Sequence, residues 1–393
     1  MKSIETPVYR LTAKSILRSF QISHKKHILI TGSIGAGKST LAQKLIKLLC
    51  GTEKSLPVPG FTTHAFFQSR VELTDSSNDE SYIVGRYLEG ESQSPKLPDF
   101  PEHINRMVPV EEGFLSGGAA AVDHAITSDC GWAFLDEIGY LEETCPFFQD
   151  KLRQLFDTKQ VLAVVRGQSL PFLNELKNRD DVYLLDLDHP FLSVGCVIMA
   201  SGIGKRFGSN KLLANFDGKP LISHVLDLTE HSPFAQRIVV TRHAEIEELC
   251  SLRGIDVILH DLPGRNDTVR LGLSKILHSS GNDNSSDLTD KSDYAGCIFI
   301  PADQPLLTLE SLETMILTFS HSNPDTICRL AGSPVLFGSR YFGELLNLPD
   351  GKGGGVLLAQ YPKHVVVIPT EDSLELSDID TPEDLIKLEK ERK

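Results

Sequence analysis

The chain alternates short, continuous runs of apolar residues with stretches whose apolar residues recur at helical spacing. Continuous apolar runs of about five residues are typical of strands that are buried on both faces of a parallel sheet. In the first half of the chain, such strands are predicted at residues 27–31, 132–136, 161–165 and 182–186. A helix is predicted at residues 41–50, directly after the first strand and a glycine-rich loop.

Two other segments of the first half carry little of this pattern. Residues 1–25 are interpreted as a short leader that contains one helix. Residues 73–105 are rich in Ser, Asp, Pro and Glu, and they are predicted to form loops and short elements over a site.

The alternation restarts at about residue 190, where a second strand–glycine loop–helix unit begins. Strands are predicted at residues 195–200, 237–241, 296–302 and 364–369, and helices at residues 220–228, 268–277 and from Thr381 onward. Pro220 is placed at the first helical position, and the polar run 281–293 is predicted to be a mobile loop. The sequence therefore predicts an α/β protein of two domains, residues 1–190 and 194–393, each with a nucleotide or phosphate site.

Composition narrows the class of protein. The 393 residues are 40% hydrophobic and 23% charged, which is ordinary for a globular chain, and the net charge of −14 disfavours nucleic acid and anionic membranes as partners. The seven cysteines are scattered and form no CxxC pair, so neither a disulfide framework nor a zinc site is predicted. Because no membrane-spanning run and no signal sequence are found, we expect a cytoplasmic protein.

The first glycine-rich loop, GSIGAGKS at residues 32–39, satisfies the P-loop pattern G-x-x-x-x-G-K-[ST]. Its glycines let the backbone wrap the phosphates of a nucleotide, while Lys38 reaches the β and γ phosphates and the Ser39 hydroxyl binds Mg²⁺. The motif follows a predicted strand and opens a predicted helix, as this chemistry requires. The expected nucleotide-binding residues are Gly32, Gly35, Gly37, Lys38, Ser39 and Thr40.

An acidic pair, Asp136 and Glu137, ends the apolar strand at 132–136. A carboxylate in this position of a P-loop protein holds Mg²⁺, and the next one orients or deprotonates the attacking water. We therefore assign Asp136 to the metal and Glu137 to catalysis. Arg166 ends another predicted strand, and it is either a residue that stabilises phosphate charge or a plain surface arginine.

Residues 27–188 resemble the THEP-type nucleoside triphosphatases of bacteria and archaea. The resemblance is carried by the P-loop, by DEIGYLE at residues 136–142 and by GFTT at residues 60–63. It implies a P-loop three-layer sandwich that hydrolyses ATP, GTP or related nucleotides slowly. The segments 66–80 and 113–118 depart from the family pattern.

The second glycine-rich loop, ASGIGKRFGSNKLL, spans residues 200–213. Its backbone N–H groups would wrap a triphosphate, and Arg206 and Lys211 would neutralise charge on the phosphates and on the departing pyrophosphate. The residues assigned to the nucleotide are Ala200, Ser201, Gly202, Gly204, Arg206 and Lys211. A glycine-rich loop with basic residues also arises by chance, so the assignment depends on further segments.

Two acidic segments supply these. Asp303 follows the strand at 296–302, at the carboxyl edge where open α/β sheets bind ligands, and is assigned as an Mg²⁺ ligand. Asp380, within SDIDTPED at 377–384, either completes the metal site or caps the helix that follows.

Residues 194–391 resemble the molybdopterin nucleotidyltransferases of the GT-A-like family. The loop, DQP (303–305), GSPVLF (332–337) and DIDTPEDL (378–385) stand in the family's order. The opening Ala-Ser-Gly at residues 200–202 and the GSPVLF segment favour the cytidylyl branch. The segment at 264–273 resembles the one that contacts base and ribose in such transferases, which assigns Arg265 and Asp267 to the nucleotide.

This resemblance implies a Rossmann-like GT-A-type nucleotidyltransferase that transfers CMP from CTP to a molybdopterin-type cofactor with Mg²⁺ and releases pyrophosphate. Lys211, Arg206 and Asp303 would be its catalytic residues, and a molybdenum hydroxylase apo-enzyme is a conceivable partner. GKGGG at residues 351–355 departs from the family's G-D-x-G-[AG]-R pattern.

Three alternatives remain open. The acceptor is another phosphorylated compound, such as a sugar phosphate or methylerythritol phosphate, because RNDTVR at 265–270 is closer to the cytidylyltransferases of isoprenoid synthesis. The first domain is the P-loop partner of GTP-dependent guanylyl transfer. The chain is a cofactor chaperone with a P-loop switch.

Overall fold

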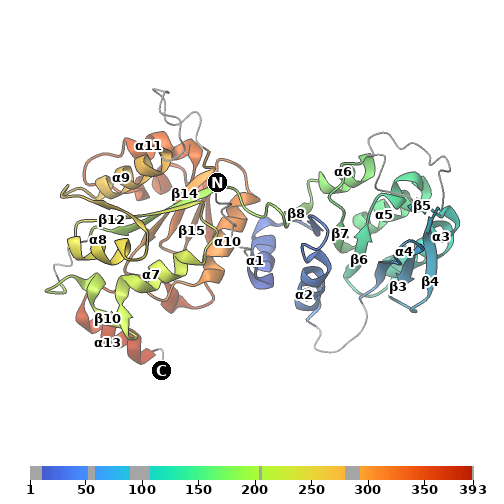
Figure 1. Ribbon diagram of the computed structural model, residues 1–393, viewed down its shortest axis with the longest axis horizontal. Coiled ribbons are helices and arrows are strands. Elements are labelled where there is room, and N and C mark those ends of the chain that lie inside the picture. The colour runs from blue at the N-terminus through green and yellow to red at the C-terminus, as the bar shows by residue number, and fades with distance from the viewer. Residues whose placement is uncertain (1–10, 52–57, 89–106, 203–205, 279–292, 392–393) are drawn as a thin grey trace. The chain divides into compact units, whose positions relative to one another are not determined.

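The computed structural model describes residues 11–51, 58–88, 107–202, 206–278 and 293–391 (Figure 1). Two compact units make up the chain. The N-terminal unit comprises residues 23–190, and the C-terminal unit comprises residues 191–393 together with the first helix, α1. The predicted loop at 281–293 lies outside the described residues except for its last residue.

Helix α1 (Ala13–Ser23) packs within the C-terminal unit, so the predicted first domain of residues 1–190 must be corrected. The Ser15 hydroxyl donates to Glu313 Oε2 at 2.6 Å, and Arg18 pairs with Glu310 at 3.2 Å. Glu313 is fully buried, and a buried carboxylate requires such donors. The helical spacing of α1 indicated an amphipathic helix, but a periodic pattern does not say which surface the apolar face covers.

The N-terminal unit is built on an eight-stranded sheet of order β5-β4-β3-β2-β6-β7-β1-β8. Strands β2, β6, β7, β1 and β8 are parallel, and β3, β4 and β5 extend the sheet as an antiparallel meander. The strands are β1 (His27–Thr31), β2 (Gly60–Ala65), β3 (Arg70–Asp75), β4 (Ser81–Tyr87), β5 (Met107–Pro109), β6 (Trp132–Ile138), β7 (Gln160–Val165) and β8 (Val182–Asp186). The helices are α2 (Lys38–Cys50), α3 (Glu111–Gly113), α4 (Ala119–Thr127), α5 (Pro146–Thr158) and α6 (Pro171–Lys177).

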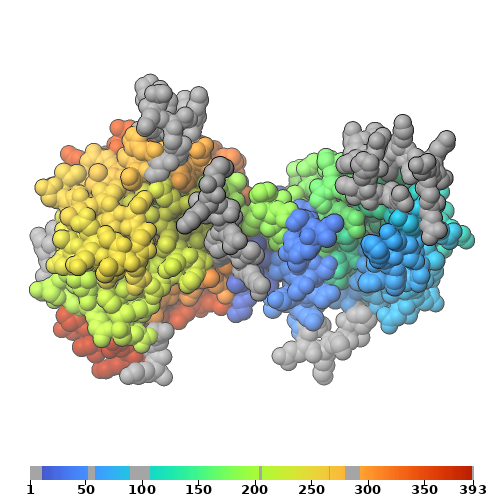
Figure 2. All heavy atoms as spheres, in the orientation of Figure 1, coloured from blue at the N-terminus to red at the C-terminus, as the bar shows by residue number. Residues whose placement is uncertain are grey.

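Helices cover both faces of this sheet, which gives the predicted three-layer sandwich (Figure 1). One core joins α4, α5 and α6 to strand residues such as Leu135 and Ala163. Helix α2 packs on β1, β6 and β7 through Ala42, Leu45 and Ile46, which lie outside that core. The opposite face of α2 is exposed and forms part of the surface of its own unit, drawn in blue in Figure 2.

Where the structure describes residues 73–105, short strands stand among the loops and short elements that the sequence predicted there. Residues 70–75 and 81–87 form the hairpin β3–β4. Apolar and polar residues mix in these strands because one of their faces is largely exposed, as is usual for antiparallel strands near the edge of a sheet. Residues 89–106 lie outside the described residues.

The departure from the family pattern at residues 113–118 has a packing reason. These residues belong to one continuous helical stretch, α3 to α4, which passes close to β4. A Cβ atom on Gly117 would lie 2.0 Å from the ring of Tyr82, and one on Gly113 would lie 2.0 Å from the carbonyl oxygen of Ile83. Glycine is therefore needed at both positions for the helix to reach the sheet.

The C-terminal unit is built on a seven-stranded sheet of order β13-β12-β9-β14-β16-β15-β17. The strands β13, β12, β9 and β14 are parallel, and β16 is antiparallel to both of its neighbours. The strands of the sheet are β9 (Val194–Ala200), β12 (Gln236–Thr241), β13 (Asp256–Leu259), β14 (Gly296–Pro301), β15 (Ile327–Leu330), β16 (Val335–Gly338) and β17 (Val365–Ile368), and a separate hairpin pairs β10 (Asn215–Phe216) with β11 (Lys219–Pro220). The helices besides α1 are α7 (Leu221–Glu230), α8 (Ala244–Ser251), α9 (Arg265–His278), α10 (Leu309–Ser320), α11 (Phe342–Leu346), α12 (Gly355–Gln360) and α13 (Pro382–Glu391).

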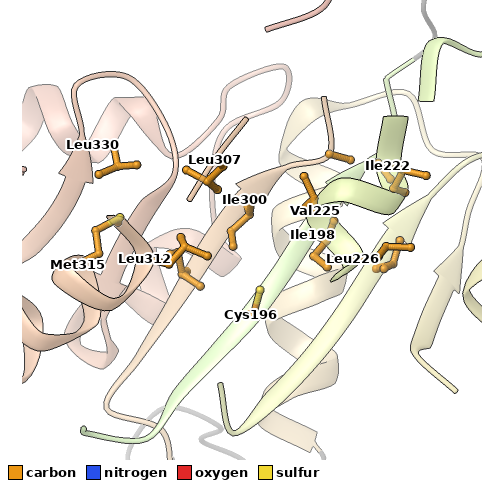
Figure 3. Packing of buried hydrophobic residues seen from close by; sticks show 14 of the residues in the cluster. Cys196, Ile198, Ile222, Val225, Leu226, Ile300, Leu307, Leu312, Met315 and Leu330 are labelled. Carbon is orange, nitrogen blue, oxygen red and sulfur yellow. The ribbon is translucent and has the colours of Figure 1, made fainter. Parts of the chain in front are cut away.

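Two apolar cores cover the two faces of this sheet. One joins α7, α8 and α10 to β9 and β14, and Figure 3 shows Ile198 and Ile300 of these strands packed with Val225 and Leu312 of the helices. The other joins α9 and α11 to alternate residues of the same strands, including Val197 and Phe299. Because both faces of β9 and β14 are buried, these strands have the continuous apolar sequences from which they were predicted.

The strands and helices predicted for this unit are confirmed, with shifts of one to three residues at their ends. Helix α7 begins at Leu221, so Pro220 precedes the helix instead of occupying its first position. Helix α9 begins at Arg265, three residues earlier than predicted. All seven cysteines are free thiols, and within the described residues no helix is long and apolar enough to cross a bilayer.

Candidate active sites

The first site lies where β1 leads through the P-loop into α2. Gly32, Gly35 and Gly37 have φ values of 139°, 85° and 88°, which side-chain-bearing residues rarely adopt, so this loop needs its glycines. The loop borders a cavity of about 740 Å³ together with residues of β2 and β6 and residues that follow β7 and β8. The predicted residues Gly32, Gly35, Gly37, Lys38, Ser39, Thr40, Asp136, Glu137 and Arg166 all line this cavity, as do Thr63, Gln168 and Asp188.

The acidic pair at the end of β6 meets the start of α2. The Ser39 hydroxyl donates to Asp136 Oδ1 at 2.9 Å, so two oxygen groups suited to a hard cation are in direct contact. Burial raises the pKa of Asp136 above its ordinary value, and the hydrogen bond from Ser39 opposes this rise. The carboxylate is thus costly to bury without a counter-charge, which favours cation binding at this point.

Two cations flank Glu137. Arg166 Nε donates to Glu137 Oε2 at 2.9 Å, and Lys38 Nζ lies 4.0 Å from Glu137 Oε1. Lys38 also donates to the carbonyl oxygens of Gly32 and Ser33 at 3.1 and 2.9 Å, which holds its ammonium group at the loop. Arg166 is therefore part of the site, and the alternative of a plain surface arginine is set aside.

The segment after β8 closes the P-loop from the other side. Asp188 accepts hydrogen bonds from the backbone N–H and the hydroxyl of Ser33, at 2.7 and 2.8 Å. Sequence reasoning missed Asp188, because a single acidic residue in a loop carries no pattern.

The second site lies at the carboxyl edge of β9, β12 and β14. Its cavity of about 730 Å³ is bordered by Ser201, Gly202, Arg206, Lys211 and Asp380 from the glycine loop and the chain before α13. Three segments that are distant in sequence converge at Lys211, whose Nζ lies 2.7 Å from Asp303 Oδ2 and 2.8 Å from Asp380 Oδ1. Arg206 lies at 3.5 Å from the other oxygen of Asp380.

This ion-pair cluster sets the charge of its members. Burial by itself would lower the pKa of Lys211, but the hydrogen bonds that Lys211 donates to Asp303 and Asp380 outweigh burial and raise the pKa above its usual value. The hydrogen bond from Lys211 lowers the pKa of Asp380. Asp378 stands behind this pair with a raised pKa, caused first by burial and then by the charge of Asp303, and Gln304 donates to it at 2.9 Å.

Polar contacts from neighbouring strand ends hold the start of the glycine loop. The Ser201 hydroxyl contacts His260 Nε2 at 2.9 Å and donates to the carbonyl oxygen of Val240 at 3.1 Å. His243 Nε2 lies 3.0 Å from the carbonyl oxygen of Gly202. The start of the loop is thereby tied to residues at the ends of β12 and β13.

The remaining walls of the cavity are mostly apolar. They include Met199, Val269, Phe299, Val335, Phe337 and Leu345, together with Ser333 and the glycines Gly353, Gly354 and Gly355. A pocket with an ionic cluster at one end and apolar walls elsewhere suits a ligand that carries both phosphates and a ring system.

Two known families match the chain, one on each side of the boundary near residue 190 that divides the two compact units. The family described as "NTPase" matches residues 27–190, and the family described as "MobA-like NTP transferase domain" matches residues 196–365. The chain joins an NTPase domain to a MobA-like NTP transferase domain. Both family descriptions name nucleoside triphosphates as the molecules on which their members act.

Individual relatives match one domain each. The NTPase domain is 27% identical over 164 residues to nucleoside-triphosphatase THEP1 of Thermotoga maritima, covering 41% of this chain and 86% of that protein. The transferase domain is 35% identical over 65 residues to a probable molybdenum cofactor guanylyltransferase of Pyrococcus horikoshii, covering 16% of this chain and 34% of that protein. It is 44% identical over 57 residues to 2-C-methyl-D-erythritol 4-phosphate cytidylyltransferase of Rhodopirellula baltica, covering 14% of this chain and 24% of that protein.

Not every residue predicted for the transferase domain faces its cavity. Asp267 accepts a hydrogen bond from the Gly264 N–H at 2.8 Å and pairs with Arg270, so its buried carboxylate stabilises the start of α9, and its assignment to the nucleotide stays a prediction. Ala200 is fully buried at the end of β9. Gly204 and the side chain of Arg265 lie outside the described part of the chain.

Sequence reasoning also missed residues of the transferase site. Arg242 and Thr268 line the cavity, and Gln304 and Asp378 support the ionic cluster. For Gln304 a signal existed, since it directly follows Asp303 in the DQP segment. Arg242 had none, because it stands one residue beyond an ordinary strand end.

In the NTPase domain, Glu142 lies 2% exposed beneath the site and accepts a hydrogen bond from the Gly139 N–H at 2.9 Å. Burial raises its pKa from 4.5 to about 7, and backbone hydrogen bonds oppose the rise. Because the folded state binds this proton more tightly, the resulting stability is fully present below pH ~4.5 and is lost as the pH rises to about 7. We expect Glu142→Gln to raise the free energy of unfolding at pH 8 by roughly 2 kcal/mol and to leave it nearly unchanged at pH 4.5.

Trp132, the single tryptophan, lies in β6 and reports the unfolding of this domain alone. Urea titrations at pH 4.5 and 8, followed by its fluorescence, measure the effect. Glu112→Gln changes an exposed carboxyl of the same domain and is the matched control. If the free energy of unfolding changed between pH 4.5 and pH 8 by the same amount in Glu142→Gln as in the wild type, the raised pKa would not belong to Glu142.

Proposed function

We propose that the transferase domain moves a nucleoside monophosphate from an NTP to the terminal phosphate of a molybdopterin-type cofactor, with CTP as the nucleotide. The observation that carries the proposal is the cluster of Lys211, Asp303 and Asp380 at the mouth of a glycine-rich loop. Such a cluster offers both a cation for phosphate oxygens and carboxylates for a divalent ion. The opening Ala-Ser-Gly at residues 200–202 supports CTP.

The reaction consists of one displacement. A phosphate oxygen of the acceptor attacks the α-phosphorus of the NTP, the bond from that phosphorus to the bridging oxygen breaks, and pyrophosphate leaves with the electron pair. The backbone N–H groups of Ser201 and Gly202 bind phosphate oxygens, and Lys211 and Arg206 neutralise charge that moves onto the pyrophosphate. The apolar walls with Phe299 and Phe337 receive the ring system of the acceptor.

The residues present fit Mg²⁺. Asp303 and Asp380 both contact the single Lys211 ammonium, so their oxygen atoms lie close enough together to share a cation. Mg²⁺ in nucleotide enzymes is commonly held by one or two carboxylates and the substrate phosphates. Asp303 and Asp380 would hold the ion, which supplies neutralisation of phosphate charge.

For the NTPase domain we propose hydrolysis of the terminal phosphate of ATP or GTP. Ser39 and Asp136 would hold Mg²⁺, and Glu137 accepts a proton from the attacking water, with Arg166 and Lys38 fixing its position. Lys38 and the P-loop N–H groups neutralise the transferred phosphoryl group.

Guanylyl transfer is the second candidate, because the transferase domain is similar to a probable molybdenum cofactor guanylyltransferase. Because the domain is also similar to a methylerythritol phosphate cytidylyltransferase, methylerythritol phosphate is tested as a second acceptor.

The full-length protein is incubated with Mg²⁺, each of the four NTPs in turn, and either molybdopterin or methylerythritol phosphate. We expect pyrophosphate release only with CTP and molybdopterin. Pyrophosphate release with GTP would show that GTP, not CTP, is the nucleotide. Release with methylerythritol phosphate would show that this compound is the acceptor. No release in any combination would refute the proposed transfer.

A further inference from the structure

Arg242 presents a hydrogen-bonding problem in the transferase domain. It follows β12, is half-buried, and borders the cavity. Its Nε is buried and has no hydrogen-bond partner among the described residues, and no ion pair joins its guanidinium group to a carboxylate there. A buried donor without an acceptor is unfavourable, so a ligand that fills the cavity is the natural source of the acceptor.

The neighbours of Arg242 do not supply one. Burial, and then the charge of Arg242, lower the pKa of His260. The Nε2 of His260 contacts the Ser201 hydroxyl, and its buried Nδ1 makes no hydrogen bond among the described residues, so it accepts none from Arg242. The next cavity residues are Pro263 and Gly264, which carry no side-chain acceptor. The guanidinium group therefore borders the cavity without a hydrogen bond to its Nε from these residues.

The sheet order places Arg242 at the end of the cavity that is opposite the ionic cluster. In the order β13-β12-β9-β14, Asp303 follows β14 and Arg242 follows β12, with β9 and its glycine loop between them. Two strand spacings amount to about 10 Å. If the triphosphate lies on the glycine loop, as the proposed function requires, the base extends toward β12 and β13, where Arg242, Pro263 and Gly264 form the wall.

A guanidinium group has a fixed fork of N–H donors that matches two adjacent acceptors. Guanine offers O6 beside N7, and cytosine offers O2 beside N3. Adenine places its amino donor between N1 and N7, and uracil places the N3–H donor between its two oxygens, so neither base offers an adjacent pair of acceptors to the fork. We infer that Arg242 reads the edge of the nucleobase and selects CTP or GTP over ATP and UTP at the transferase site.

The test compares Arg242→Gln with the wild type in the full-length protein, in a Lys38→Ala background that weakens nucleotide binding at the P-loop. Equilibrium dialysis with radiolabelled CTP, GTP, ATP and UTP and with Mg²⁺ measures the four Kd values. We expect Arg242→Gln to weaken CTP or GTP binding by between about 5-fold and 100-fold. ATP binding should stay constant or strengthen, because glutamine pairs with the adenine N6 and N7. Arg237→Gln is the matched control, since Arg237 lies on β12, the strand that Arg242 follows, but donates to the carbonyl oxygen of Leu226 outside the cavity.

The outcomes separate this inference from the proposed function. Equal weakening of all four nucleotides assigns Arg242 to the phosphates and overturns the inference, as does an unchanged preference. Absence of binding by the wild-type transferase site to every NTP overturns the proposed function itself. Pyrophosphate release with the four NTPs repeats the comparison in turnover, where the ratio of kcat/KM values must shift in the same direction as the Kd values.

Discussion

Replacing Asp303 by alanine is expected to abolish nucleotidyl transfer, lowering kcat/KM by roughly 1000-fold or more. Asp303 is a half-buried carboxylate that contacts Lys211 at 2.7 Å and is proposed as a ligand of Mg²⁺. Its loss removes an oxygen ligand and leaves Lys211 with Asp380 alone, so the phosphates lose both the divalent ion and the correctly placed ammonium group. Pyrophosphate release with CTP and molybdopterin measures the effect.

The domain itself should remain folded in this variant, because β14 and its packing end before Asp303. Thermal unfolding followed by circular dichroism checks this. Asp256→Ala removes an exposed carboxylate at the start of β13 and serves as the control with unchanged turnover. Wild-type turnover by Asp303→Ala would refute the metal assignment.

Replacing Lys38 by alanine is expected to reduce nucleotide hydrolysis by roughly 1000-fold and to leave nucleotidyl transfer unchanged. Lys38 is held at the P-loop by the carbonyl oxygens of Gly32 and Ser33, where it neutralises the β and γ phosphates. The transferase site lies in the other compact unit and contains its own lysine, Lys211. Phosphate release from ATP and GTP measures the loss, and pyrophosphate release is measured on the same preparation.

Lys44→Ala is the matched control, because Lys44 lies on the exposed face of the same helix, α2. If Lys38→Ala hydrolysed nucleotides at the wild-type rate, the assignment of the P-loop to the catalytic site of hydrolysis would be refuted. A parallel loss of transfer would show that the two domains depend on each other, in contradiction to the expectation of independent sites.

The two sites solve a similar electrostatic problem in different ways. In the NTPase domain, Lys38 stays with backbone carbonyl groups at 4.0 Å from the nearest carboxylate oxygen, so its charge is available to a phosphate. In the transferase domain, Lys211 is buried in direct contact with Asp303 and Asp380. Phosphates that bind there must compete with two carboxylates for the ammonium group, unless a divalent cation takes over the carboxylates. This makes the proposed dependence on Mg²⁺ a property of the cluster itself.

The sequence alone determined the features that depend on neighbouring residues. The P-loop at 32–39 is a contiguous motif, and its glycines, lysine and serine all line the cavity in the order predicted. The Asp136–Glu137 pair could be assigned because the end of a buried parallel strand is also the edge of the sheet. The strands β1, β8, β9 and β14 were predictable since their continuous apolar runs have no other stable place in a folded chain.

Only the tertiary structure decided which distant segments meet. Lys211, Asp303 and Asp380 converge because β9 and β14 are neighbours and the chain before α13 returns to them, and no periodicity in the sequence encodes strand order. The same holds for Arg242, which enters the site from β12, and for helix α1, which joins the C-terminal unit through Ser15 and Glu313. Apolar periodicity reports that a face is buried, whereas the partner that buries it is selected by packing and hydrogen bonding over the whole chain.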